Sequence, residues 1–191
     1  MNSLFHRLDD PTQHPEKVCI PTGPDKWLEF ARGYKEAADH LASTINQTGT
    51  NVLSAPMMFL YRHYLELHLK SLLKDAGEAL DEQQPIPPRH YLLNLWGRVR
   101  TLLLRMRPNA ESELVRADDL IRQLDTRDAT SFAFRYPVDK SGAASLRVPV
   151  SIHPLVVKYC IEELYDLLDG ASLTAEAIEF LKSEGLWVKP E

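Results

Sequence analysis

Apolar residues recur along most of the chain at intervals of three and four, which places them on one face of an α-helix. The first stripe covers residues 27–45 and follows Asp25, which we interpret as a helix N-cap. A second stripe begins at Ser54 and runs to Leu73, over about six turns. It predicts the longest helix of the fold.

Further stripes cover residues 92–106, 114–124 and 157–168. Pro154 suits the first turn of the last of these helices, and Gly170 is expected to end it. A short final helix is then expected over 174–184. The pattern predicts an all-α, up-and-down bundle of about five helices.

The spacing of apolar residues changes between the fourth and fifth predicted helices. Apolar residues alternate with others over 132–138 and again over 146–150, and the sequence DKSG between them is typical of a turn. The prolines at 137 and 149 cannot donate ladder hydrogen bonds, so we expect an irregular excursion. The sequence predicts a short hairpin-like insertion over about 128–150.

Length and composition predict one domain. The 191 residues divide into a proline-rich arm over 1–24 and a helical domain over 25–191, with 44% hydrophobic and 26% charged residues. No apolar stretch is long enough for a membrane helix, and the first ten residues lack the apolar core of a signal peptide. We therefore expect a cytoplasmic protein that has no membrane partner.

The net charge of −5 disfavours a protein that coats nucleic acid over its whole surface. A local exception is residues 89–107, which hold five arginines and no acid, and Arg98 and Arg105 of this stretch are candidate RNA contacts. The next segment, residues 111–128, is rich in acids. The two segments either offer a basic surface or pair with each other.

Motifs for metals and cofactors are missing. The sequence contains neither GxGxxG nor GxxxxGK, and Cys19 and Cys160 form no CxxC pair. His63 and His68 are five residues apart, about 140° around a helix, so they are not expected to share a metal. We predict neither a metal nor a cofactor.

The most suggestive cluster lies in the second predicted helix and comprises Arg62, His63, Glu66, His68 and Lys70. One interpretation is structural, because Arg62 with Glu66 and Glu66 with Lys70 are spaced i,i+4 for ion pairs. The other is catalytic: a guanidinium binds phosphate and an imidazole moves a proton, which is what metal-free RNA cleavage requires. The spacing of these residues alone does not decide between the structural and the catalytic interpretation.

Three runs of sequence resemble bacterial members of the HEPN superfamily, the "higher eukaryotes and prokaryotes nucleotide-binding" helical domains. These runs are FLYRHYLELHLKSLL at 59–73, RHYLLNLWGRVRTLL at 89–103 and DATSFAFRYPVDKSG at 128–142. The resemblance implies a HEPN-like bundle and a homodimer. It also implies a toxin–antitoxin or phage-defence system, with an antitoxin as a protein partner.

Many members of the family are RNases, and their hallmark is an arginine, four to six residues, then a histidine. Arg62 and His68 match this spacing and become the implied catalytic residues, with His63 and Glu66 supporting them. The hallmark usually starts a late helix, whereas this match lies inside the second. The resemblance therefore implies either a metal-independent endoribonuclease or RNA-binding protein, or a non-catalytic protein-interaction or nucleotide-binding module.

The remaining candidates for binding RNA or a nucleotide are His90, Arg135 and Tyr136. His90 begins the third helix, where it serves equally as a cap or an interhelical hydrogen bond. Arg135 stands among aromatic residues, where an arginine stacks on a base or binds phosphate, or ties its loop to a nearby aspartate.

Overall fold

Five α-helices form the body of the protein. The computed structural model describes residues 20, 22, 23, 25–82, 84–88, 90–146, 148 and 150–188. The helices are α1 (Trp27–Thr48), α2 (Ser54–Ala79), α3 (Leu92–Met106), α4 (Glu111–Arg127) and α5 (Pro154–Ser183), with one 3-10 turn, Pro108–Ala110, between α3 and α4. The predicted all-α class with about five helices is confirmed.

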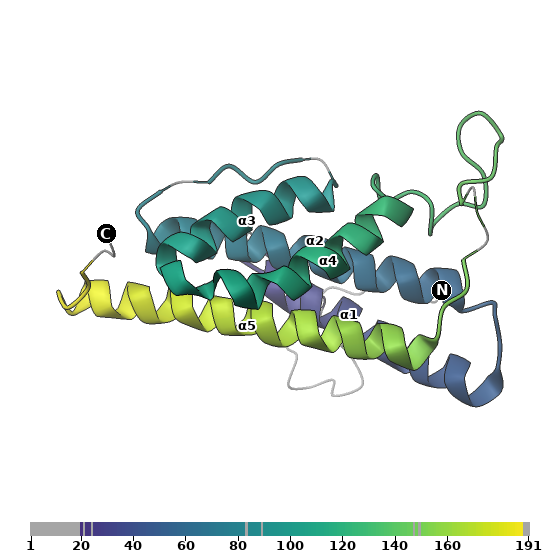
Figure 1. Cartoon of the computed structure of the whole chain (residues 1–191), viewed down its shortest axis with the longest axis horizontal. Helices are drawn as coiled ribbons and strands as arrows, with labels where there is room; N and C mark the ends of the chain where they lie inside the picture. The colour runs from purple at the N-terminus through teal and green to yellow at the C-terminus, as the bar shows by residue number, and fades with distance from the viewer. Residues whose placement is uncertain are drawn as a thin grey trace, which may run out of the picture.

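The second helix is the centre of the bundle. It packs against α1, α3 and α5, and α4 closes the bundle against α3 and α5. In Figure 1, α5 runs along one long side of the molecule, with α3 and α4 above it and α1 behind. Because α2 has neighbours on several sides, most of its residues from Tyr61 to Leu73 are buried, including polar ones.

Two predicted helix ends differ from the structure. Helix α1 begins after Lys26 rather than Asp25 and has no side-chain cap. Helix α5 continues through Gly170 to Ser183, so the expected separate helix over 174–184 is wrong. Buried apolar residues recur at helical spacing on both sides of Gly170, and this packing outweighs the roughly 1 kcal/mol that a glycine costs inside a helix.

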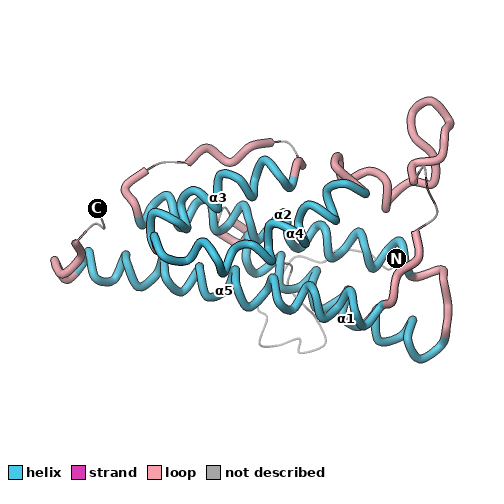
Figure 2. Tube along the Cα trace, viewed as in Figure 1, coloured by secondary structure: helices cyan, strands magenta, loops and turns pink. Residues whose placement is uncertain are grey.

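The segment between α4 and α5 is a loop with a hairpin-like tip, drawn in pink in Figure 2. Its only pairing among the described residues is one antiparallel bridge between Val138 and Ala144. The turn predicted at DKSG is present, with Gly142 at φ 84°. The described residues within 132–138 and 146–150 form no strand, and residues 132–136 form tight turns instead.

The predictions of an N-terminal arm and of no membrane helix can be compared only with the described residues. Of the proline-rich arm predicted over 1–24, only residues 20, 22 and 23 are described. No helix in the described part of the chain has the length and apolar character needed to cross a bilayer.

Candidate active site

Arg62 ties three segments of the fold together from a completely buried position on α2. Its Nε donates to the backbone oxygen of Asp128 at 2.7 Å. Its Nη2 donates to the backbone oxygens of His90 at 2.5 Å and Ala129 at 3.3 Å. Its Nη1 lies 3.4 Å from the Glu66 carboxylate. The guanidinium thereby fixes the entry to α3 and the exit of α4 against α2.

Glu66 lies one turn further along α2 and is also buried. Its Oε1 accepts a hydrogen bond from Lys70 Nζ at 2.8 Å, so both i,i+4 ion pairs expected from the sequence are present. Burial alone would raise the pKa of Glu66, but the hydrogen bonds from Lys70 and His90 outweigh it and lower the pKa. Glu66 is therefore a buried, ionised carboxylate.

His90 joins this buried carboxylate to the surface. Its Nδ1 lies 2.6 Å from Glu66 Oε1, and its side chain is 51% exposed while that of Glu66 is 1% exposed. Because an ionised carboxylate only accepts hydrogen bonds, Nδ1 carries the proton. In the neutral ring Nε2 is then a free acceptor. A buried acid that orients an exposed imidazole is the arrangement of a general base.

His63 is a second, half-buried imidazole on the same side of α2. Its ring stacks on Phe59 at a centroid distance of 5.6 Å and meets Tyr34 of α1 edge-on at 4.5 Å. Burial lowers the pKa of His63, although Glu66 opposes this effect.

The turn after α4 places an arginine and an aromatic ring near His63 and Phe59 of α2. The Asp128 carboxylate shapes the turn by accepting hydrogen bonds from the backbone nitrogens of Phe132 at 2.6 Å and Ala133 at 2.9 Å. Arg135 then lies 5.7 Å from the ring centre of Phe59 and 5.6 Å from that of Tyr136.

Arg135 and Tyr136 are both exposed. The Arg135 Nε donates to the backbone oxygen of Ser131, which fixes the side chain in place. A fixed guanidinium beside exposed aromatic rings can bind a phosphate or stack on a base.

His68 is not part of this surface. It lies six residues beyond Arg62, which puts the two side chains about 120° apart around α2, and it is completely buried. Its Nδ1 lies 3.2 Å from the Tyr64 hydroxyl, and its Nε2 has no hydrogen-bond partner. Burial lowers the pKa of His68 to about 4, so the ring is neutral. The expectation that Arg62 and His68 together touch RNA is not supported, because neither reaches solvent.

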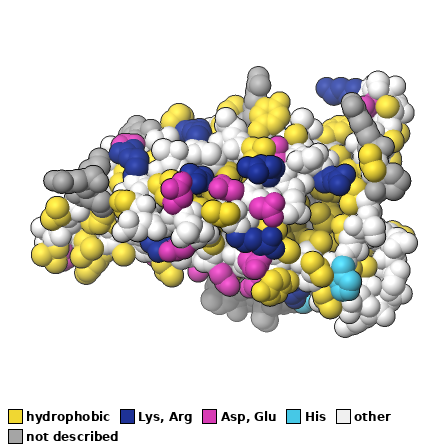
Figure 3. Space-filling model, viewed as in Figure 1, with side chains coloured by type: hydrophobic (Ala, Val, Ile, Leu, Met, Phe, Trp, Pro, Cys, Tyr) yellow, Lys and Arg dark blue, Asp and Glu magenta, His cyan; other side chains and the backbone are white. Residues whose placement is uncertain are grey.

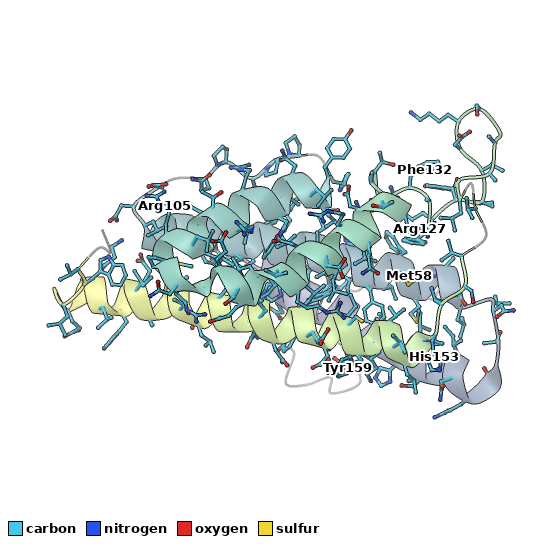
Figure 4. The ribbon with its side chains drawn as sticks, viewed as in Figure 1. Met58, Arg105, Arg127, Phe132, His153 and Tyr159 are labelled. Carbon is cyan, nitrogen blue, oxygen red and sulfur yellow. The ribbon has the colours of Figure 1, made fainter. Side chains whose placement is uncertain are left out.

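Arg98 and Arg105 also lie away from the candidate site. Arg98 donates to the Gln84 side chain at 3.0 Å, and Arg105 forms a two-point contact with the Glu82 carboxylate. In Figure 4, Arg105 and Phe132 lie toward opposite ends of the molecule.

Two other arginines of the 89–107 stretch, Arg100 in α3 and Arg107 just after it, pair with the acidic segment that follows, as the second interpretation of the charge pattern expected. Arg100 contacts Glu111 and Asp118, and Arg107 contacts Glu113. These contacts leave less positive charge free on α3 for nucleic acid.

The fold thus brings together His63, Glu66, His90, Arg135 and Tyr136, with Arg62 beneath them, and we call this set the α2 site. Sequence reasoning missed the direct contact between Glu66 and His90, which are 24 residues apart and carry no local signal. Sequence reasoning also missed a second match to the RNase hallmark: Arg147 and His153 are separated by five residues, as Arg62 and His68 are. Arg147 lies outside the described residues, and His153 is exposed at the start of α5 (Figure 4).

Comparison with known proteins gives no match. No protein-family model, no curated protein and no solved structure is significantly similar to this chain. The resemblance to HEPN domains stays a prediction from the sequence runs quoted above.

Proposed function

We propose that this protein is a HEPN-like, metal-independent endoribonuclease whose general base is His90. The observation that carries the proposal is the 2.6 Å contact between the buried Glu66 carboxylate and the half-exposed His90 imidazole. Glu66 orients the ring and stabilises the imidazolium that forms when His90 takes a proton. This replaces His68, the base expected from the hallmark spacing, with a histidine that solvent and substrate reach.

The reaction is an internal transfer within RNA. His90 Nε2 removes the proton of a ribose 2′-hydroxyl, and the 2′-oxygen attacks the adjacent phosphorus. The bond from phosphorus to the 5′-oxygen of the next nucleotide breaks, and that oxygen takes a proton from water, which recovers one from His90. The products are a 2′,3′-cyclic phosphate and a 5′-hydroxyl, so atoms and charge balance without an added reagent.

The remaining residues of the α2 site bind and position the substrate. Arg135 neutralises charge on the phosphate, and Tyr136 offers a ring on which a base stacks. Arg62 is a positioning residue, because it is buried and acts by holding the backbone of His90 and of the turn after α4. A homodimer with an antitoxin partner belongs to the same proposal and rests on the HEPN resemblance alone.

The test is cleavage of a mixed RNA pool in EDTA, followed by analysis of the fragment ends. The parent protein is expected to produce cyclic phosphate ends, and His90→Ala is expected to lower the rate by about 100-fold or more, the usual contribution of a general base. Glu66→Gln is expected to lower the rate less. His68→Leu is the matched control: it replaces a buried histidine of the same helix and should leave the rate unchanged.

Two results contradict this assignment. If His153→Ala stops cleavage and His90→Ala does not, the base is His153 and the α2 site is structural. If the folded parent protein cleaves no RNA, the non-catalytic alternative replaces the proposal, and the contact between Glu66 and His90 only locks α3 onto α2.

A further inference from the structure

A cavity of about 470 Å3 lies between α4 and the first half of α5. Its volume is in the usual range for small-molecule pockets. Residues from α2, α4, α5, the turn after α4 and the segment 150–152 line it, and apolar side chains predominate, among them Met58, Leu120, Leu124, Phe134, Val157 and Leu164. Figure 4 places Met58 between Arg127 and His153 at this end of the molecule.

Arg122 and Arg127 of α4 also line this cavity. Both are exposed, and no described residue forms a hydrogen bond or an ion pair with either guanidinium. Every other arginine in the described part of the chain donates to a carboxylate, an amide or a backbone oxygen. The two unpaired arginines therefore line one apolar pocket of an acidic protein, about 140° apart around α4, so they flank the pocket from two sides.

The one carboxylate among the lining residues pairs with neither Arg122 nor Arg127. Asp119 accepts from Arg116 Nη1 at 3.3 Å and from Gln123 Nε2 at 2.9 Å. On the face drawn in Figure 3, hydrophobic side chains and dark blue Lys or Arg side chains lie side by side around α4. An anion at either side of the cavity would meet a free guanidinium group, and its apolar part would enter the cavity.

We propose that this cavity binds a small amphiphilic anion, with an aliphatic or aromatic body inside the pocket and one carboxylate or phosphate on Arg122 or Arg127, which flank it. Because apolar side chains predominate in the lining, they favour an aliphatic or aromatic body inside the cavity. The cavity shares no lining residue with the α2 site, so the proposal is independent of RNA cleavage.

A second cavity of about 670 Å3 lies against the first. The two share Met58, Phe134 and the segment 150–152 as walls. An extended alkyl chain therefore has apolar surface available beyond the first cavity.

Isothermal titration calorimetry of the full chain tests the proposal with three probes of equal chain length below their micelle concentrations. These probes are decanoate, decyl phosphate and the neutral 1-decanol. We expect saturable binding of at least one anion, at least tenfold tighter than that of decanol. The stronger of the two anions identifies the preferred head group.

Variants of α4 separate the guanidinium contacts from general effects. Arg122→Ala with Arg127→Ala is expected to weaken anion binding at least tenfold and to leave decanol binding unchanged. Arg32→Ala is the matched control, because Arg32 is exposed, is paired with Asp169 and does not line the cavity. Both changes are at exposed positions, and circular dichroism checks that the variants fold.

Three outcomes would overturn the proposal. The first is no saturable binding of either anion. The second is equal affinity for the anions and decanol. The third is equal weakening by the Arg32 variant and the double variant, since the effect would then be one of overall charge.

Discussion

Two buried polar side chains of α2, Arg62 and His68, have opposite surroundings. Near the start of α2, Arg62 is surrounded by acceptors: three backbone oxygens and the Glu66 carboxylate. One and a half turns later, His68 has a single polar contact, with Tyr64, and one ring nitrogen without a partner. Both side chains are 0% exposed.

The difference is explained by what lies opposite each residue. Arg62 faces the ends of α3 and α4, where backbone groups are free of intrahelical partners and accept its hydrogen bonds. His68 faces the side of α5, where the backbone is already satisfied and the neighbouring ring is that of Tyr165. A charged side chain is retained at the first position, whereas only a neutral one is stable at the second.

Removing the Arg62 side chain is expected to have the largest effect on stability. Arg62→Ala leaves Glu66 without one cationic partner and leaves several buried carbonyls unsatisfied. Loss of one partner of a buried ion pair costs about 3–5 kcal/mol. Urea unfolding of the parent and variant measures the free energy of unfolding.

Arg32→Ala serves as the control for this experiment, because Arg32 forms an exposed ion pair with Asp169. We expect it to cost no more than about 1 kcal/mol. A loss of less than about 1 kcal/mol in Arg62→Ala as well would show that the tie between the three segments is unimportant for folding.

The second prediction concerns pH and His68. The pKa of His68 is about 4 in the folded protein and near its ordinary value of 6.5 in the unfolded chain, so the unfolded chain binds the proton first. Stability is therefore lost as the pH falls from about 6.5 to 4, by roughly 3 kcal/mol in all.

His68→Leu isolates this contribution. Near neutral pH the variant should be as stable as the parent to within about 1 kcal/mol, because leucine removes an unpaired buried polar atom. The difference in unfolding free energy between parent and variant should then change across the window from pH 6.5 to 4. A constant difference over that window would mean that His68 gains a partner or solvent when it is protonated.

Helical periodicity was sufficient to predict the bundle, because each helix buries one regular stripe of apolar residues. Gly170 misled the prediction: glycine often ends helices, but here the apolar residues continue at helical spacing past it, and their packing keeps α5 continuous. The alternation over 132–138 failed for another reason: the Asp128 carboxylate binds the backbone there and favours a turn over a strand.

The sequence indicated which residues belong to the candidate site, but not which of them contact each other. Periodicity shows that Arg62 and Glu66 share a face of α2, and both i,i+4 ion pairs follow from it. It does not show which face is covered by other helices, so it could not reveal that His68 is buried. The partner of Glu66, His90, comes from another segment, and only the fold brings the two together.

The smallest predicted effect on stability is that of Arg105, which forms an exposed ion pair where that of Arg62 is buried. Arg105 makes a two-point contact with Glu82, but the two side chains are 38% and 34% exposed, so water competes with the pair. A double-mutant cycle of Arg105→Ala and Glu82→Ala isolates their coupling energy. We expect at most about 1 kcal/mol, decreasing in high salt, because exposed ion pairs are screened.

The same Arg105 variant tests the basic surface expected from the sequence. If α3 contacted RNA, loss of Arg105 would weaken binding and reduce its salt dependence by about one phosphate contact. The contact with Glu82 leads us to expect no change in RNA affinity or in its salt dependence. Arg135→Ala provides the comparison, because it removes an exposed guanidinium from the α2 site and should weaken RNA binding. Equal effects of the two variants would mean that RNA binding is not confined to the α2 site.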